Sequence, residues 1–201
     1  MILNLGCGKS LIQDAINIDI YSSNGVDKVC DFTKLPLEWE SNSIDGIYML
    51  HSLEHIPNAN ALIVELHRIL KKGGFLFITV PHSSRSTSVG SMEHYRTYSC
   101  YTFRDCLCNN SYMFGKALFT TEINEVRWSC YPYNEKHPYI KFKTSRSSRP
   151  PKLNKLLFGL LFKPLSIIIQ FFINLSPQTF EYLWCYYVGG ASEVVWKGIK
   201  V

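Results

Sequence analysis

The sequence predicts an α/β protein with a mostly parallel sheet, helices on both faces of the sheet and an antiparallel last strand. Three observations predict this fold class. Short apolar runs recur through the first eighty residues, a glycine loop follows the first run, and an acidic residue ends each of the next two. In open parallel sheets the loops after the strands meet at one edge, where ligands bind. We therefore expect the glycine loop and the two acids to lie at that edge.

The length and composition fit one globular domain. The chain has 201 residues, of which 46% are hydrophobic and 18% charged, which is enough to bury a sizeable core. Its seven cysteines include no C-x-x-C pair, so we expect reduced packing residues inside a cell and no metal site. The first residues enter a strand directly, so no signal peptide is expected.

The first strand leads into a glycine loop, MILNLGCGKS, over Met1–Ser10. Gly6 and Gly8 have no Cβ, so the backbone can turn sharply and let a ligand approach its amides. The next strand, Ala15–Ile20, carries Asp19 near its end, and a carboxylate there can accept two hydrogen bonds from a ribose diol. This corner predicts nucleoside binding; a plain β-turn is the alternative.

The connection between these two strands is too short for a full crossover helix. A complete dinucleotide motif has a third glycine and a helix of about a dozen residues. Here Leu11 stands in the place of the third glycine, and only Cys7–Asp14 connect the strands. A pyrophosphate on a long helix N-terminus is therefore disfavoured, and a nucleoside with a small charged tail is favoured.

The next elements continue the sheet. Lys28–Phe32 is expected to be a third strand, and Ser43–Leu50 a buried fourth strand. The apolar spacing then predicts a helix that begins at Asn58 and ends at a capping Gly73. The run Phe75–Val80 is apolar throughout, which is typical of a strand buried on both faces.

The second half of the chain completes the fold less clearly. A polar loop, Pro81–Ser91, is expected at the same edge as the glycine loop, and a short helix over Thr102–Asn109. Ala117–Trp128 alternates enough to form a strand, with Ala191–Val201 as its partner at the end of the chain.

Together these patches resemble the class I S-adenosylmethionine-dependent methyltransferases, in particular the small type that modifies glycans and metabolites. The resemblance implies a Rossmann-like fold, S-adenosyl-L-methionine as cofactor, and methyl transfer. It covers residues 1–130 and the last strand. The patches that carry it are Leu3–Gly8, Asn17–Asp19, Cys30–Asp31 with Leu35–Pro36, and Leu50–Ile56 with Arg68–Gly74.

The resemblance also implies which residues contact the cofactor. Asp19 is expected to take the ribose hydroxyls, and Asp31 the adenine amino group. A helix cap or a turn acid is the alternative for each carboxylate. The backbone of the glycine loop is expected around the methionine moiety. The implied cofactor-binding residues are Leu5, Gly6, Cys7, Gly8, Asp19, Ile20, Asp31, Phe32, Leu50 and His51.

Two features depart from the usual class I pattern, namely the missing first crossover helix and the missing helical extension before the first strand. A later segment is therefore expected to cover the cofactor, either Ser83–Tyr98 or an insert over residues 131–190. We expect a cofactor-binding domain of residues 1–130 plus 191–201, interrupted by this basic and apolar insert.

The acceptor side is expected after the fifth strand. Displacement at the sulfonium carbon needs mainly positioning, but an alcohol acceptor must lose a proton, usually to histidine. The candidates for this catalytic base are His94 and His82. His94 and Arg96 belong to a His-x-Arg-x-aromatic run that ends at Tyr98 and resembles an acceptor-facing patch, so Arg96 and Tyr98 are expected to contact substrate. A loop pairing of Glu93 with Arg96 is the alternative.

The insert carries the basic charge of the chain. Between residues 136 and 180 there are eight Lys or Arg and no Asp or Glu. The apolar run Leu153–Leu175 is too interrupted for a membrane span. We favour helices that pack over the sheet as a lid or a dimer face; peripheral membrane contact through residues 141–175 is the alternative. Nucleic acid binding is disfavoured, because no recognition motif accompanies the basic arm.

We therefore expect a cytoplasmic methyltransferase that acts on an oxygen of a sugar, a lipid-linked glycan or a small metabolite. Location at a membrane surface and homodimer formation stay open. Two rival interpretations are a nucleotide-binding α/β protein of the oxidoreductase type and a non-catalytic docking protein that keeps the cofactor fold.

Overall fold

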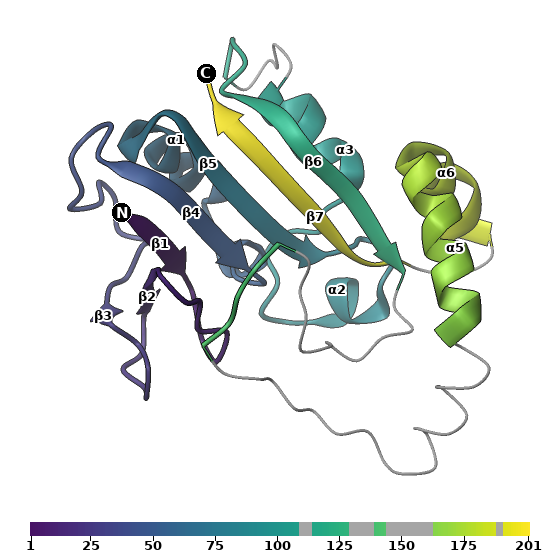
Figure 1. Cartoon of the computed structure of the whole chain (residues 1–201), viewed down its shortest axis with the longest axis horizontal. Helices are drawn as coiled ribbons and strands as arrows, with labels where there is room; N and C mark the ends of the chain where they lie inside the picture. Colours follow the sequence, from purple (N-terminus) through teal and green to yellow (C-terminus); the bar gives the residue numbers. More distant parts are fainter. Residues whose placement is uncertain (109–113, 129–138, 144–162, 188–190) are drawn as a thin grey trace.

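The computed structural model describes residues 1–108, 114–128, 139–143, 163–187 and 191–201. Their centre is a seven-stranded sheet in the order β3-β2-β1-β4-β5-β7-β6 (Figure 1). The strand β7 runs antiparallel to both β5 and β6, and all other neighbouring strands are parallel. The mostly parallel sheet with an antiparallel last strand is confirmed. The strands are β1 (Ile2–Leu5), β2 (Ile16–Asp19), β3 (Lys28–Val29), β4 (Ile44–Leu50), β5 (Leu70–Pro81), β6 (Phe119–Trp128) and β7 (Ala191–Lys200).

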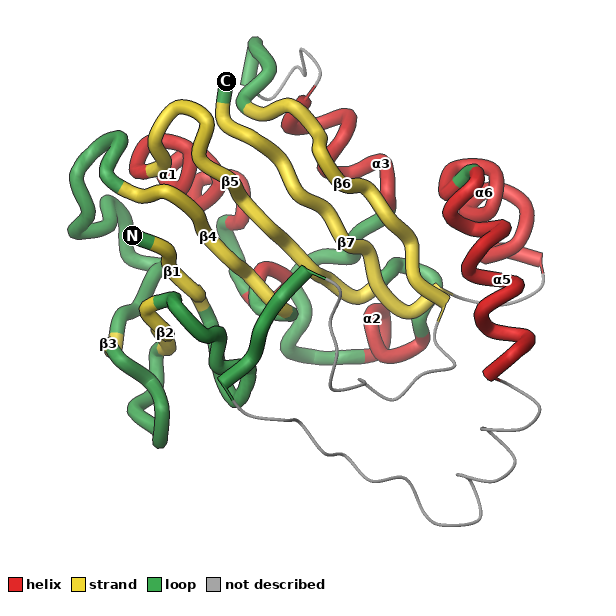
Figure 2. The backbone as a smooth tube through the Cα atoms, in the orientation of Figure 1, coloured by secondary structure: helices red, strands yellow, loops and turns green. Residues whose placement is uncertain are grey.

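Four of the described helices take two positions around this sheet, and α2 lies near the ends of β5 and β7 (Figure 1). Figures 1 and 2 show α1 and α3 on one face, and α5 and α6 beside the edge strand β6. The helical elements are η1 (Leu53–His55), α1 (Ala59–Ile69), α2 (Ser86–Gly90), α3 (Cys100–Phe103), the π-helical segment η2 (Arg104–Cys108), α5 (Lys163–Leu175) and α6 (Pro177–Tyr187).

Side chains alternate between the two faces of the central strands. In β4, Ile47 and Met49 belong to the main core that includes residues of α1. Leu50 belongs instead to a second cluster, with Phe77 of β5 and Ile140. The segment of residues 139–143 therefore packs on the sheet face opposite to α1 (Figure 1).

The same segment also pairs with the loop between β1 and β2. Gln13 N–H donates to Lys141 O at 2.9 Å, and Lys143 N–H donates to Leu11 O at 2.8 Å. A short piece of the insert thus lies beside the glycine loop, although the two are more than one hundred positions apart in the sequence.

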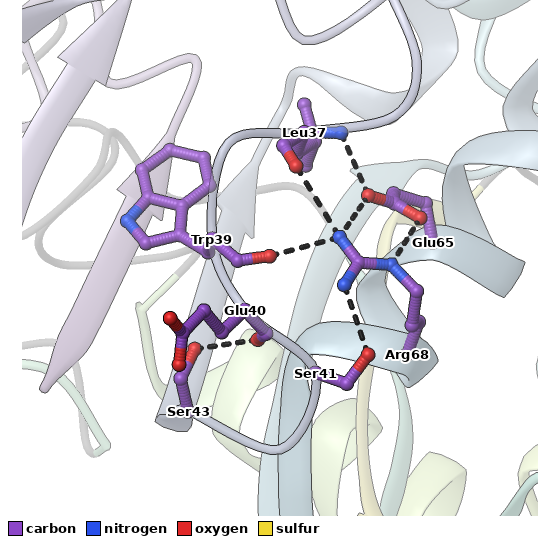
Figure 3. A network of polar contacts seen from close by, with 7 residues as sticks. All are labelled: Leu37, Trp39, Glu40, Ser41, Ser43, Glu65 and Arg68. Atoms are coloured by element: carbon purple, nitrogen blue, oxygen red, sulfur yellow. Dashed lines mark hydrogen bonds and ion pairs between the residues drawn. The ribbon is translucent and has the colours of Figure 1, made fainter.

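The loop that leads into β4 is anchored to α1 by one ion pair (Figure 3). Arg68 and Glu65 approach to 2.6 Å, and Glu65 accepts the N–H of Leu37 at 2.7 Å. Arg68 also donates to Trp39 O at 2.9 Å and Ser41 Oγ at 3.0 Å. The carboxylate and guanidinium satisfy each other and backbone groups of the loop, which fixes the chain between β3 and β4.

Several predicted boundaries differ from the structure, and the expected loop Pro81–Ser91 contains the short helix α2. The third strand ends at Val29, before Phe32. The helix predicted to end at Gly73 ends at Ile69, because Leu70 is extended and pairs with Ile44. Gly73, with φ of +78°, lies in β5 instead of capping the helix. The short helix expected over Thr102–Asn109 begins earlier, as α3, and continues as η2.

The helix α5 covers the edge strand β6 and leaves one face open. Its Ile173 is buried against Val126 and Phe180, and Gln170 Nε2 donates to Val126 O at 2.9 Å. No helix of the described residues is long and apolar enough to cross a membrane. The exposed side chains of α5 include Ile167, Ile168, Phe171, Phe172 and Leu175.

Candidate functional site

The glycine loop turns the chain at the carboxyl end of β1. Gly6 has φ of +70° and Gly8 has φ of +48°, a region that favours glycine. A Cβ at Gly6 would lie 2.5 Å from Ser52 Cβ, whereas a Cβ at Gly8 would meet nothing within 4 Å. Gly6 is therefore required by packing, and Gly8 leaves open space in which a ligand can approach the backbone.

Asp19 lies directly beside this loop. Its Oδ2 accepts the N–H of Gly8 at 2.8 Å, and its Oδ1 accepts the N–H of Tyr21 at 3.2 Å. Each carboxylate oxygen has two acceptor positions, so these bonds leave capacity for the hydroxyls of a ribose. The structure thus brings together the two parts of the predicted nucleoside corner.

A buried amide pair holds the loop in the place of a crossover helix. Residues 6–15 contain no helix, as expected. Asn4 Nδ2 donates to Asn17 Oδ1 and to Ser10 O, both at 2.8 Å. Asn17 Oδ1 also accepts the N–H of Ile12 at 2.8 Å, and Asn17 N–H donates to Asp27 Oδ2 at 2.8 Å. The two asparagines therefore supply the partners that helical hydrogen bonds would otherwise supply.

Asp31 and Phe32, predicted at the adenine, follow β3. The Asp31 carboxylate accepts the N–H and the hydroxyl of Thr33 at 3.1 and 2.6 Å. These hydrogen bonds lower the pKa of Asp31. Phe32 is buried, and a Cβ added at Gly6 would lie 3.4 Å from the Phe32 ring. The structure places Phe32 at the glycine loop and Asp31 in a turn; contact of Asp31 with adenine stays a prediction.

The other predicted cofactor residues surround the same loop. Leu5 and Cys7 are buried, Leu50 packs against Ile12 on the sheet face opposite to α1, and Ile20 is exposed. Burial and the Asp19 charge raise the pKa of Cys7 to about 11, which keeps its side chain a neutral thiol.

His51, at the end of β4, lies between two carboxylates. Its Nε2 is 3.0 Å from Glu193 Oε2, and its Nδ1 is 3.6 Å from Glu54 Oε1. Burial by itself lowers the pKa of His51, but the hydrogen bonds to Glu193 and Glu54 outweigh it and raise the pKa to about 9. Glu193 also pairs with Arg127 at 3.1 Å. His51 is therefore cationic at neutral pH, beside the edge predicted to hold the sulfonium.

His82, one of the two predicted bases, is completely buried. Its Nδ1 accepts the N–H of Ser84 at 3.1 Å, and its Nε2 is 3.5 Å from Glu181 Oε2 of α6. Burial raises the pKa of Glu181, but hydrogen bonds from His82 and Cys100 outweigh it and leave that pKa below its usual value. His82 thus joins the end of β5 to α6.

His94, Arg96 and Tyr98 line one cavity of about 470 Å³, a volume typical of small-molecule sites. None of the predicted cofactor residues lines this cavity, so it is a space distinct from the glycine corner. Its wall comes from η1, α1, residues 88–98, α3, η2 and Phe114. The lining residues are Leu53, Ala59, Asn60, Ile63, Ser88, Val89, His94, Tyr95, Arg96, Thr97, Tyr98, Thr102, Phe103, Cys106, Leu107 and Phe114.

Each of the three predicted acceptor residues has a defined partner. His94 Nδ1 is 3.1 Å from Ser88 O; because a carbonyl only accepts, this nitrogen carries the proton and Nε2 keeps its lone pair. Arg96 donates to Asn60 Oδ1 at 2.9 Å. Tyr98 is buried with its ring stacked on Phe103 at 5.5 Å, and burial raises its pKa.

Sequence reasoning missed the two glutamates around His51. Glu54 lies three positions after His51 in the sequence, and Glu193 lies 142 positions after it. Only the pairing of β7 with β5 brings Glu193 to this edge, opposite Pro81. No local pattern in the sequence could have signalled that contact.

Comparison with known sequences supports the resemblance. A family model for the methyltransferase domain matches residues 3–78. A curated relative, the sterol 4-C-methyltransferase strm-1 of Caenorhabditis elegans, is 31% identical over 75 residues. That match covers 35% of this chain and 22% of the relative. The chain therefore spans about a fifth of the length of the relative that it matches.

Comparison with solved structures supports the fold. The S-adenosylmethionine-dependent methyltransferase of Archaeoglobus fulgidus has a TM-score of 0.56 at 14% identity, over 99% of this chain and 85% of that one. The [4+2]-cyclase SpnF has a TM-score of 0.50 at 16% identity, over 99% and 74%. Residues 3–78 thus match the model of a methyltransferase domain, and the chain has the Rossmann-like fold found in S-adenosylmethionine-dependent methyltransferases of known structure.

Proposed function

We propose that this protein is a methyltransferase that transfers the methyl group of S-adenosylmethionine to an oxygen of a small acceptor, a sugar, a lipid-linked glycan or a metabolite. The observation that carries the proposal is the glycine corner, where Asp19 accepts the N–H of Gly8 and Phe32 lies against Gly6. This corner falls inside the segment that matches the methyltransferase-domain model.

The cofactor would lie along the carboxyl ends of β1, β2 and β4. Asp19 would bind the ribose hydroxyls, and the open side of Gly8 would leave room for the methionine moiety. Leu50 and His51, which follow β4, would stand near the methyl group. Holding the donor in one orientation is the main contribution that this reaction needs from the protein.

The acceptor would bind in the cavity beside residues 88–98. Its hydroxyl oxygen would attack the methyl carbon while the bond from sulfur to methyl breaks, which leaves S-adenosylhomocysteine. The proton of the hydroxyl would pass to His94 Nε2, whose lone pair is available because Nδ1 donates to Ser88 O. Arg96 would bind an anionic or hydroxyl-rich part of the acceptor.

The insert would help to cover the cofactor. Residues 139–143 pair with the loop that follows Gly8, and Ile140 packs with Ile12 and Leu50. This arrangement supports the division of the chain into a cofactor-binding domain, residues 1–130 and 191–201, and an insert over residues 131–190 with a covering role. The missing crossover helix makes such a cover useful, because no helix among the described residues lies next to β1 on this sheet face (Figure 1).

The test is methyl transfer by the full chain from labelled S-adenosylmethionine to a panel of sugars, lipid-linked glycans and small alcohols, with amines beside them. We expect a methylated hydroxyl product. His94→Gln should lower kcat by about 10²–10⁴ fold, the usual contribution of general base catalysis, and leave the affinity for S-adenosylhomocysteine unchanged.

The possible outcomes separate the rival interpretations. Transfer to amines alone would contradict oxygen as the acceptor atom. Cofactor binding without turnover on any acceptor would favour a non-catalytic docking protein. The cyclase with the same fold shows why the reaction must be measured, since a fold does not determine a reaction.

A further inference from the structure

Three side chains next to the cavity have the composition of a metal site. Glu54 and His55 are adjacent in η1, and His94 comes from the loop before α3. Each residue offers one potential ligand atom, and these three atoms lie within 4.8 Å of one another. We propose that Glu54, His55 and His94 bind a divalent transition-metal ion, with zinc as the first candidate.

Hydrogen bonds orient both imidazole rings for this role. His55 Nδ1 is 3.1 Å from Glu93 O, and His94 Nδ1 is 3.1 Å from Ser88 O. Backbone carbonyls only accept, so each Nδ1 carries a proton and each Nε2 keeps a free lone pair in the neutral ring. A histidine that ligates a metal typically donates its other ring N–H in this way.

Glu54 supplies an independent observation. Its side chain is almost completely buried, with 1% of the residue exposed. Its Oε1 is 3.6 Å from His51 Nδ1, and its Oε2 has no hydrogen-bond partner among the described residues. A buried carboxylate oxygen without a partner is costly, and a bound cation is one of the few groups that can compensate for it.

The donor set indicates the class of ion. Two imidazoles and one carboxylate suit zinc and other first-row divalent ions, whereas magnesium and calcium prefer oxygen ligands. In a tetrahedral zinc site, ligand atoms about 2.1 Å from the ion lie about 3.4 Å apart. The ligand atoms, which now lie within 4.8 Å of one another, would therefore have to approach by up to about 1.4 Å when the ion binds.

The ion would lie at the wall of the cavity. His94 belongs both to the three-residue cluster and to the cavity lining. Three protein ligands leave a fourth position, which a water molecule or an oxygen of a bound acceptor could take. The ion would also connect the loop that carries His94 to η1.

Metal binding can be tested separately from the proposed methyl transfer. The two proposals share His94 Nε2, because this atom would be a ligand in the occupied site and a base in the empty one. Methyl transfer by metal-free protein tests the proposed function, and metal binding in the absence of cofactor tests the metal site. Failure of either result leaves the other unaffected.

The experiment uses the full chain after removal of metals with a chelator. Zn²⁺ is titrated by calorimetry, and Co²⁺ is followed by its visible absorption. We expect one ion per chain. His55→Ala and His94→Ala should each weaken binding at least about tenfold, because loss of an outer hydrogen-bond partner alone costs about 10–100 fold. His67→Ala is the matched control: His67, in α1, packs edge-on against Phe119 of β6 and is not one of the three proposed ligands, so binding should be unchanged.

Three results would overturn the proposal. One is no binding by the folded wild-type chain, and another is wild-type affinity for the ion in both histidine variants. The third is a sulfur-to-cobalt absorption band, because cysteines would then hold the ion. Glu54→Gln is a useful third variant, but Glu54 is buried and its loss can affect folding. The two histidine variants, at less buried positions, keep the test decisive.

Discussion

Gly6 and Gly8 look alike in the sequence, but the structure gives them different tasks. Both have positive φ, yet only Gly6 faces a neighbour that excludes a Cβ. We predict that Gly6→Ala lowers the free energy of unfolding by about 2 kcal/mol or more, the sum of backbone strain and a clash with Ser52. Gly8→Ala should cost about 1 kcal/mol and mainly reduce the affinity for S-adenosylhomocysteine.

Urea unfolding and calorimetric titration of the two variants separate these effects. Equal destabilisation by both substitutions would show that the contact with Ser52 is unimportant. Unchanged cofactor affinity in folded Gly8→Ala would show that the ligand does not approach the backbone at this position.

Single residues also show the limit of prediction from sequence. The role of Asp19 could be predicted, because a carboxylate at the end of the strand that follows a glycine loop commonly accepts hydrogen bonds from a ribose. Glu193 could not be predicted, because its contact with His51 depends on the register between β5 and β7. Asp31 illustrates the intermediate case, since its bonds to Thr33 also fit a turn acid.

Among the elements, the connection between β1 and β2 depends on Asn17. We predict that Asn17→Ala lowers the free energy of unfolding by about 2–4 kcal/mol, because it leaves the N–H of Ile12 and the amide of Asn4 without their buried partner. The same substitution should weaken cofactor binding, because the Asn17 amide holds the segment that directly follows the glycine loop. Urea unfolding measures the effect, with the exposed Asn24→Ala as control. Equal stability of the two variants would contradict this role for Asn17.

The loop between β3 and β4 gives a prediction of pH dependence. The hydrogen bond from Arg68 lowers the pKa of Glu65 below its ordinary value of 4.5. A lowered pKa means that the ion pair stabilises the folded state above pH 4.5 and that this stabilisation is lost as the pH falls further. We predict that Glu65→Gln costs about 1–3 kcal/mol at pH 7 and progressively less below pH 4.5.

Chemical unfolding at a series of pH values measures this difference, and the exposed Glu40→Gln serves as control. A cost that stays constant down to pH 3 would show that Glu65 does not contribute as a carboxylate.

At the scale of the whole molecule, the order of apolar runs in the first eighty residues predicted the parallel strands. Strands buried on both faces leave a clear signal, because nearly every position is apolar. The placement of the insert left no such signal, since contacts such as Ile140 with Leu50 join distant segments. Peripheral membrane contact through residues 141–175 stays a prediction. Within that range, residues 144–162 lie outside the described part of the chain, and α5 exposes apolar side chains such as Phe171 and Phe172.

The most direct test of the central claim is calorimetric titration of the purified full chain with S-adenosylhomocysteine and, separately, with NAD. Asp19→Ala is the test variant, and Asp45→Asn is the control. Asp45 is exposed, pairs with Lys71 and lies at the start of β4, away from the carboxyl end where the cofactor is expected. The account predicts micromolar binding of S-adenosylhomocysteine that is lost in Asp19→Ala, kept in Asp45→Asn and not seen for NAD. Absence of binding by the folded wild-type protein, or equal affinity in folded Asp19→Ala, would contradict it.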